Sequence, residues 1–272
     1  MNRSRSDQHD RVRERFTRTA QQFASFSLTT RAAEAERLVR LAAPGPDWVA
    51  LDVACGPGTF TFALAPRVRL VYGLDLTLAL LEQARAAAAK LGLTNLAFIY
   101  GEAAALPFAD SVMDLATCAY SWHHFPDPAP AIQELARVVR PGGCVAVVDL
   151  IVPDDPAQAE VNNQMERARD ASHTRTLAAS EIRALLESAG LRIRAWETEE
   201  RLRSFDDWMH IAGWKPGDPA YAQTRRRMEA STAGDRAGFH PRFVTPAAAG
   251  SPPPHGDIEF VQTSLFAVAE KH

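Results

Sequence analysis

Between residues 49 and 150, short apolar segments alternate with segments of helical period, and this alternation restricts the chain to few folds. Five apolar runs have the length of strands, at residues 49–53, 70–74, 96–100, 112–119 and 144–150. Helical segments lie among them, at residues 60–64, 78–91 and 129–139. Strands that are apolar throughout are typical of parallel sheets buried on both faces. Right-handed connections then predict a doubly wound α/β sheet, which binds ligands at the carboxyl ends of its strands.

The segments on either side of this alternation are less regular. Residues 1–10 are polar and predict a frayed tail, followed by helices from residue 12 and over residues 30–41. Later strands are expected at 191–196 and 258–269, with an insertion at about 197–256 that contains helices over 205–213 and 220–231. We expect one structural domain, made of a tail with cap helices (1–42), a core (43–152) and a part that completes the sheet (153–272).

The bulk composition excludes several classes of protein. A formal net charge of −3 gives no general electrostatic reason to bind nucleic acid or an anionic membrane. Cys55, Cys118 and Cys144 lack metal-site spacing, so no metal site is predicted, and we expect buried thiols in a reducing compartment. No signal peptide and no membrane-spanning stretch is recognisable, which predicts a cytoplasmic protein.

A glycine-containing loop follows the first predicted strand. Residues 52–58 read Asp-Val-Ala-Cys-Gly-Pro-Gly, and glycines there allow a tight turn and a close approach to a ligand. A dinucleotide fingerprint would place a third glycine where this chain has Thr61. The acidic Asp52 suits the cationic methionine part of S-adenosylmethionine (SAM). Asp75, at the end of the second strand, can accept both ribose hydroxyls of either cofactor, so the loop and Asp75 alone do not discriminate.

Six ordered segments carry a resemblance to a known family. They are residues 52–58, 73–75, 101–108 (Gly-Glu-Ala-Ala-Ala-Leu-Pro-Phe), 114–116, 124–128 (His-Phe-Pro-Asp-Pro) and 134–143. Together they resemble the class I SAM-dependent methyltransferases of the small-molecule type, and most of all the ubiquinone/menaquinone C-methyltransferase group. The resemblance extends over residues 45–152 and fades after 195. It implies a Rossmann-like, seven-stranded, mostly parallel sheet with helices on both faces and an antiparallel last strand.

The resemblance also implies contacts with the SAM cofactor. The matching positions are Phe23, Asp52, Ala54, Gly56, Gly58, Asp75, Leu76, Glu102, Ala103 and Ala119. Asp52 and the glycine loop would face the methionine part, Asp75 the ribose, and Leu76 the adenine. The carbonyl near Ala119 would take the ammonium. Phe23 would cap the site where the family often has a tyrosine, so any role of that hydroxyl is lost.

Candidates for acceptor chemistry are spread more widely along the chain. His123 follows the fourth predicted strand, and Asp149 lies at the end of the fifth. His173 lies in a His-x-Arg stretch that lines the acceptor pocket in this family. These three are the catalytic candidates, since histidine titrates near neutral pH. His124, Arg175 and Trp208 are the candidate substrate contacts. His124 has the alternative role of bracing the turn before the next helix, and the stripe containing Trp208 that of a core.

The sequence therefore predicts an enzyme that moves a methyl group from SAM to a carbon or oxygen of a small-molecule acceptor. An NAD(P)-dependent oxidoreductase and a non-catalytic SAM-binding protein are the alternatives. The segment 197–256 is expected to lie at the acceptor site. We expect no nucleic-acid partner and no membrane span, and a homodimer is one expected assembly.

Overall fold

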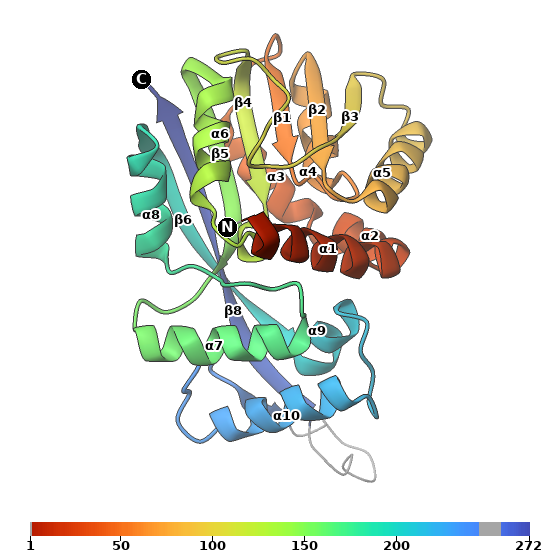
Figure 1. Ribbon diagram of the computed structural model, residues 1–272, viewed down its shortest axis with the longest axis vertical. Coiled ribbons are helices and arrows are strands. Elements are labelled where there is room, and N and C mark those ends of the chain that lie inside the picture. The colour runs from red at the N-terminus through yellow and green to blue at the C-terminus, as the bar shows by residue number, and fades with distance from the viewer. Residues whose placement is uncertain (1, 245–256) are drawn as a thin grey trace.

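The structure of the protein is a computed structural model that describes residues 2–244 and 257–272 (Figure 1). Eight strands form one sheet. They are β1 (Val49–Val53), β2 (Leu70–Asp75), β3 (Leu96–Tyr100), β4 (Met113–Ala119), β5 (Val139–Ile151), β6 (Leu191–Ser204), β7 (Arg242–Val244) and β8 (Asp257–Lys271).

Helices surround the sheet. They are α1 (Asn2–Arg18), α2 (Ala20–Thr30), α3 (Ala32–Ala42), α4 (Thr59–Leu64), α5 (Leu78–Leu91), α6 (Ala129–Val138), α7 (Pro156–Arg169), α8 (Ala179–Ser188), α9 (Phe205–Ile211) and α10 (Pro219–Ser231). Short 3-10 turns are η1 (Ala65–Arg67) and η2 (Trp122–His124). Among the residues that the structure describes, no helix is long and apolar enough to cross a membrane.

The sheet has the order β3-β2-β1-β4-β5-β8-β6. Strands β1 to β5 pair in parallel, whereas β8 runs antiparallel to both β5 and β6. The predicted mostly parallel sheet with an antiparallel last strand is therefore confirmed. The prediction of seven strands omitted β7, a three-residue strand that pairs with β8 beside the path of the other seven.

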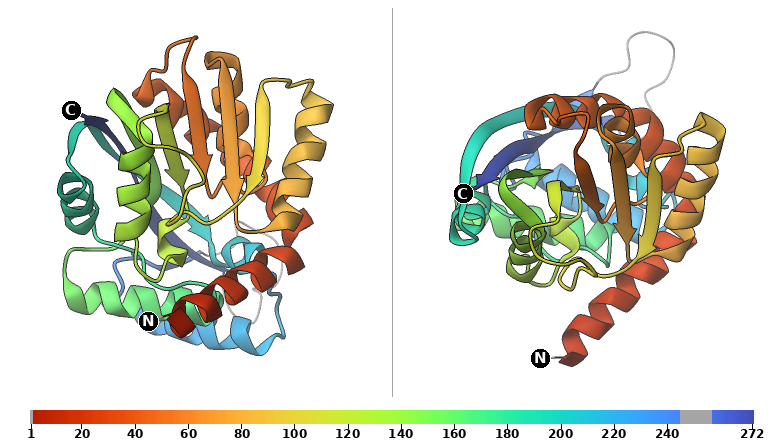
Figure 2. Two further views of the ribbon diagram at one scale, coloured as in Figure 1. Left: turned by 45° about the horizontal axis from the view of Figure 1, so that its top comes forward. Right: turned by 90° about the horizontal axis from the view of Figure 1, so that it is seen from above.

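Residues of β1 show why both faces of the sheet are buried. Leu51 and Val53 belong to a core cluster on one face, while Ala50 belongs to a second cluster that also contains Leu38 of α3 and Leu64 of α4. Because successive strand residues point to opposite faces, a strand covered on both sides must be apolar throughout. Helices lie on both sides of the sheet in the turned views (Figure 2).

The two longest strands carry a second region of the molecule. Strands β6 and β8 extend beyond the parallel sheet, where α7, α9 and α10 gather around them (Figure 1). A third cluster of buried side chains, including Phe205, Trp208 and Phe260, fills this region. The sixth strand was predicted to end at residue 196, but it continues to Ser204 because its later residues pair with β8.

The N-terminus differs most from the prediction. Residues 2–10 belong to helix α1 rather than to a frayed tail, and α1 projects from the body of the molecule beside the strand ends (Figure 2). Polar contacts fix it: the amide of Gln8 donates to the carbonyls of His124 (3.1 Å) and Ser172 (2.6 Å). The buried Arg15 pairs with Asp170 at 2.8 Å. A hydrophobicity pattern carries no information on such polar contacts, so it predicts no helix over residues 2–10.

Candidate functional site

A cavity of about 460 Å³ lies at the carboxyl ends of β1, β2 and β4. Helices α1 and α2 pass across these strand ends and supply one wall (Figure 1). The volume lies within the range of about 300–1,000 Å³ that is typical of small-ligand sites. Nine of the ten predicted cofactor contacts line it, namely Phe23, Asp52, Ala54, Gly56, Asp75, Leu76, Glu102, Ala103 and Ala119.

Gly58, the tenth predicted contact, shapes the loop without lining the cavity. It precedes α4 with a φ of 96°, a conformation that favours glycine. A Cβ atom at this position would lie 2.5 Å from the ring of Phe62. The loop turns sharply before it, with φ values of 56° at Ala54 and 55° at Gly56. The glycine turn therefore lets the backbone of the loop approach the cavity closely, beside the lining side chains of Asp52 and Pro57.

Asp52 is held by two threonines. Its carboxylate accepts hydrogen bonds from the hydroxyls of Thr61 at 2.6 Å and Thr117 at 2.8 Å. Burial raises the pKa of Asp52 to about 6, although both hydrogen bonds oppose the shift. Thr61 occupies the position of the third glycine in a dinucleotide loop, and its hydroxyl makes a contact that glycine could not. Thr117 was not predicted, because it lies on β4, 65 residues after Asp52 in the chain.

Asp75 braces the loop from the end of β2. Its two carboxylate oxygens accept from the backbone N–H of Gly56 and of Thr77, both at 2.8 Å. A carboxylate oxygen has two lone pairs, so each retains acceptor capacity for a ligand hydroxyl. Burial raises the pKa of Asp75. This carboxylate can therefore hold the loop and a ribose at the same time.

Leu76, Glu102 and Ala103 also line the cavity and give it a partly apolar surface. The Nε2 atom of His9, on α1, lies 3.6 Å from the Glu102 carboxylate. A flat ring could enter between these groups, with the carboxylate at its polar edge. Helix α1 therefore lines the cavity through His9 as well as through Phe16.

Several aromatic side chains also line the cavity. Phe16 and Phe23 meet edge to face with ring centroids 5.0 Å apart, and Phe16 meets the ring of His124 at 5.2 Å. The ring centroids of Phe60 and Tyr120 lie 6.3 Å apart. Such walls favour an apolar or ring-bearing ligand.

His124 lines the cavity, in keeping with its predicted place among the substrate contacts. Its Nδ1 lies 3.0 Å from the carbonyl of Ser172, a contact that the neutral ring makes as a donor. Burial lowers the pKa of His124 to about 3, so the ring is neutral at physiological pH. In this tautomer Nε2 accepts hydrogen bonds. His124 is thus suited to orient a hydroxyl but is a weak base.

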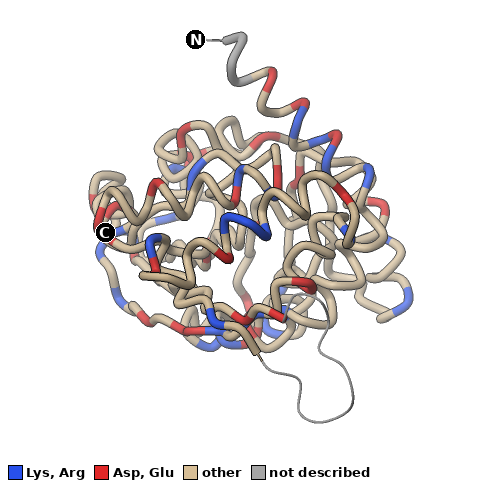
Figure 3. The backbone as a smooth tube through the Cα atoms, turned by 90° about the horizontal axis from the view of Figure 1, so that it is seen from below, with Lys and Arg blue, Asp and Glu red and all other residues tan. Residues whose placement is uncertain are grey.

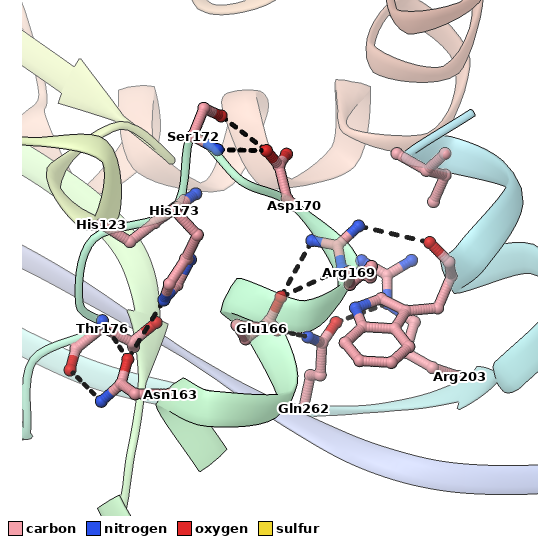
Figure 4. Close-up of polar contacts among 12 residues, drawn as sticks. His123, Asn163, Glu166, Arg169, Asp170, Ser172, His173, Thr176, Arg203 and Gln262 are labelled. Atoms are coloured by element: carbon pink, nitrogen blue, oxygen red, sulfur yellow. Dashed lines mark hydrogen bonds and ion pairs between the residues drawn. The ribbon is translucent and has the colours of Figure 1, made fainter. Parts of the chain in front are cut away.

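The three predicted catalytic residues lie together behind the cavity, and none lines it. His123 Nδ1 lies 2.6 Å from a carboxylate oxygen of Asp149. Burial alone would raise the pKa of Asp149, but His123 and the backbone N–H groups of Leu150 and Trp122 together lower it. His173 stacks on His123 at 5.4 Å and contacts Asn163 through Nε2 at 3.1 Å (Figure 4). Burial lowers the pKa of His173 well below its usual value, so the ring is neutral at physiological pH.

Two predicted substrate contacts lie elsewhere. Arg175 is exposed, and its Nη1 pairs with both carboxylate oxygens of Glu181, at 2.7 and 3.0 Å. Trp208 is 3% exposed and packs against Phe260 with ring centroids 5.0 Å apart. Among the described residues, none from the segment 197–244 lines the cavity. Neither side chain lines the cavity: Arg175 lies at the surface beside Glu181, and Trp208 is buried because α9 packs its apolar face against β8.

A buried polar network lies beyond the histidines (Figure 4). Glu166 accepts from Arg169 at 2.9 Å and from the amide of Gln262 at 3.0 Å. The amide oxygen of Gln262 in turn accepts from Nε of Arg203 at 3.3 Å. These residues join α7 to β6 and β8. Their separate positions in the sequence carried no recognisable pattern, so sequence analysis missed them.

Charge is not concentrated on one face in the view from below. Acidic and basic positions intermingle along the chain there (Figure 3). Of the clusters formed by described residues, none brings three metal-ligating side chains together. The groups best suited to bind a ligand are therefore those of the cavity, which is lined by two buried aspartates and several aromatic side chains.

Comparisons with known proteins agree with this site. A family profile described as "Methyltransferase domain" matches residues 51–147. The uncharacterised methyltransferase YcgJ of Bacillus subtilis (strain 168) is 34% identical over 163 residues, which are 60% of this chain and 64% of that protein. The demethylmenaquinone methyltransferase of Corynebacterium kroppenstedtii is 30% identical over 172 residues, which are 63% of this chain and 70% of that protein.

Solved structures extend the likeness beyond the matched core. The crystal structure of the YcgJ protein from Bacillus subtilis superposes with a TM-score of 0.80 at 26% sequence identity. That superposition covers 88% of this chain and 99% of the other. The arrangement of helices around the sheet, including the region after residue 150, is therefore shared with this relative.

Proposed function

This chain belongs to the SAM-dependent methyltransferase family, and we propose that it transfers the methyl group of SAM to a carbon or oxygen of a small, largely apolar acceptor. Membership in the family sets aside the NAD(P)-dependent oxidoreductase that the glycine loop alone left open. One observation carries the proposal. A single cavity is lined both by the buried carboxylates Asp52 and Asp75 and by the aromatic side chains of Phe16, Phe23 and Tyr120.

The acidic lining of the cavity fits the donor. Asp52 and the Ala119 carbonyl would face the ammonium, and Asp75 would accept from the ribose hydroxyls while it keeps its bonds to Gly56 and Thr77. Leu76 would pack on the adenine, with Glu102 and Ala103 at its edge. When bound, SAM supplies a methyl group that its sulfonium charge has already activated.

The aromatic lining would orient the acceptor. Positioning alone lowers the barrier of such a displacement substantially, because both reactants are held in line. Through Nε2, the neutral His124 would accept a hydrogen bond from an acceptor hydroxyl. Behind it, the pair His123 and Asp149 would fix the turn that carries His124, since Asp149 also accepts from the backbone of Trp122 at 2.8 Å.

The curated relatives support an acceptor with a ring. One of them is named for methyl transfer to demethylmenaquinone. The aromatic walls of the cavity here suit a ring of that general kind, and the resemblance to the ubiquinone/menaquinone C-methyltransferase group supports a carbon or oxygen acceptor. The particular acceptor is a matter for experiment.

Three further proposals concern the setting of the reaction. All three cysteines are free and buried, which supports a reducing, cytoplasmic compartment. The net charge of −3 supports an acceptor other than nucleic acid. We also keep the homodimer as a proposal, to be tested by light scattering.

Methyl transfer from labelled SAM to a panel of phenols, quinols and keto acids tests the proposal. We expect a methylated product with at least one ring-bearing acceptor, with the new bond located by NMR. Asp75→Ala, which removes the proposed ribose contact, should lose methyl transfer. Asp110→Ala, which alters an exposed aspartate outside the cavity, is its matched control and should keep the activity. If SAM binds and no acceptor in the panel or in a metabolite extract is methylated, the non-catalytic SAM-binding alternative is favoured instead.

A further inference from the structure

A second cavity, of about 400 Å³, lies beside helix α7 and is separate from the cavity described above. Its walls include residues 150–154 at the end of β5, Gln158, Asn162 and Glu166 of α7, residues of the segment 235–240, and residues 261–263 of β8. Among the described residues, the two cavities share no lining side chain. The family profile ends at residue 147, before every residue that lines the second cavity. This cavity therefore lies outside the segments that carry the resemblance to methyltransferases, and its volume suits a small organic ligand.

Specific contacts hold the walls of the second cavity together. The Nδ2 atom of Asn162, on α7, donates to the carbonyl of Ala237 at 3.0 Å, which ties the segment 235–240 to the helix. On the other side of the same segment, Gly238 has a φ of 67°, a conformation that favours glycine. A Cβ atom at this position would collide with the ring of Pro153, which follows β5. The cavity is thus formed by elements that already pack closely, as in most small-ligand sites.

Thr176 brings a buried hydroxyl without a partner to the second cavity. The residue lines the cavity and is 3% exposed, and its Oγ1 has no hydrogen-bond partner in the described part of the chain. The amide of Asn163 fixes its backbone: Oδ1 accepts from the N–H of Thr176 at 2.7 Å, and Nδ2 donates to its carbonyl at 3.2 Å (Figure 4). A buried polar group is unfavourable unless it is hydrogen-bonded. The hydroxyl of Thr176 is therefore held in place while its hydrogen bond remains to be made by a bound molecule.

Carboxylates make the lining of the second cavity acidic. Asp154, Glu166 and Asp235 contribute to it, whereas the described lining residues include no lysine and no arginine. Of the three carboxylates, only Glu166 is paired with an arginine in the described chain, with Arg169 at 2.9 Å. Asp235 lies 2.7 Å from Nδ1 of His240, a contact that a neutral imidazole can make as a donor. A positively charged group on a ligand is therefore attracted to this cavity.

The rest of the lining indicates an organic cation. No three metal-ligating side chains come together among the described residues, which argues against an inorganic ion. The apolar side chains of Val152, Phe239 and Val261 line the same cavity. A ligand that covers them gains from the removal of apolar surface from water. The lining thus suits a molecule that combines an apolar body with a charged group.

We propose that the second cavity binds a small organic ammonium with an apolar body, of the arylalkyl amine class. The ammonium donates to the carboxylates of the lining and to the hydroxyl of Thr176, and the body packs against Val152 and Phe239. This binding site is additional to methyl transfer and does not depend on it.

Calorimetry with matched pairs of ligands tests the proposal on the full chain. The amines are phenethylamine, tyramine and tryptamine, and their partners are the alcohols 2-phenylethanol, tyrosol and tryptophol, in which a hydroxyl replaces the ammonium. We expect at least one amine to bind the wild type about tenfold or more tightly than its alcohol, because hydrogen bonds between charged groups are the stronger ones.

Two substitutions locate the bound amine. Thr176→Val removes the unpartnered hydroxyl and keeps the shape of the side chain, so the protein should stay folded while the affinity for the amine falls by about 2- to 10-fold. Asp235→Asn removes a charge from the lining and should weaken the amine by about tenfold or more, with little effect on the alcohol.

Each substitution has a matched control outside the second cavity. Thr224→Val alters another buried hydroxyl without a partner in the described chain, and Asp110→Asn alters an exposed aspartate. Both should leave the affinity for the amine unchanged, and thermal unfolding verifies that each variant is folded.

Three results would overturn the proposal. They are the absence of binding of all three amines to the wild type, equal affinities for the amines and their alcohols, and amine affinities in Thr176→Val and Asp235→Asn that match the wild type. Thr176→Val decides alone if Asp235→Asn does not fold. None of these results bears on methyl transfer from SAM, which involves the other cavity.

Discussion

Two parts of the lining of the first cavity differ in how their residues are distributed along the chain. The lining that we assign to the donor comes from short segments that each follow one strand, such as the loop with Asp52 and the turn at Asp75. The aromatic lining that we assign to the acceptor joins Phe16 of helix α1 to Tyr120 and His124, about a hundred residues later. The first kind of site is visible in sequence because its parts keep a fixed spacing. The second depends on how distant helices pack.

Replacement of Trp208 is expected to have the largest effect on stability. The sequence suggested an acceptor contact, whereas the structure buries it beside Phe205 and Phe260 in the region around β6 and β8. Trp208→Ala should lower the free energy of unfolding by about 3–5 kcal/mol, measured with denaturant. The affinity of the folded variant for S-adenosylhomocysteine should be unchanged. A stable variant that has lost methyl transfer would return Trp208 to the acceptor site.

A substitution at Thr61 measures how much one hydrogen bond to Asp52 contributes to stability. Thr61→Val removes a donor from the buried Asp52 and keeps the shape of the side chain, so unfolding should become easier by about 1–3 kcal/mol at pH 8. Thr224→Val is the matched control, since the buried Thr224 hydroxyl has no hydrogen-bond partner in the described chain. Equal losses in the two variants would show that the contact with Asp52 contributes nothing.

The pKa of Asp52 gives a prediction for pH. Because burial raises this pKa to about 6, the carboxylate is protonated in mild acid and attracts an ammonium less. Affinity for S-adenosylhomocysteine should therefore rise by about tenfold from pH 5 to pH 7. In the free protein, the contribution of Asp52 to stability is fully present below its unfolded pKa and is lost as pH rises through about 6.

Asp52→Asn separates this titration from that of Asp75, whose pKa burial also raises. The variant should lose part of the pH dependence of ligand affinity, as measured by calorimetry at several pH values. An unchanged pH profile would mean that Asp52 does not face the ammonium.

Arg175 should give the smallest effect. Its ion pair with Glu181 is exposed, and such pairs contribute about 0–1 kcal/mol. Arg175→Ala should leave the methyl-transfer rate and the affinity for S-adenosylhomocysteine unchanged, with at most a slight loss of stability. A large rise in the acceptor KM would show that Arg175 reaches the acceptor in the complex, contrary to its place in the structure.

Sequence patterns predicted the fold where burial alone dictates it. The apolar runs that became β1, β2, β4 and β5 had to lie inside a parallel sheet, and the chain has that sheet. The first part of helix α1, residues 2–10, and strand β7 were missed. The helix is fixed by polar contacts such as Arg15 with Asp170, and β7 has only three residues, paired with β8.

The same limit applies to the site. Asp52, Asp75 and Glu102 could be found from motifs because their position after a strand determines where they point. Thr117 could not, since its importance comes from its contact with Asp52 on the neighbouring strand. His173 shows the converse: its residue type suggested chemistry, while its burial against Asn163 makes it part of the packing.

Asp75 and the glycine loop are the residues that we propose to hold the donor. Calorimetric titration of S-adenosylhomocysteine into the wild type and into Asp75→Ala tests this claim most directly, with Asp110→Ala as control. The variant loses ribose contacts and leaves the N–H groups of Gly56 and Thr77 unpaired, so affinity should fall by at least about 100-fold. A folded Asp75→Ala protein that binds S-adenosylhomocysteine as tightly as the wild type would contradict the claim.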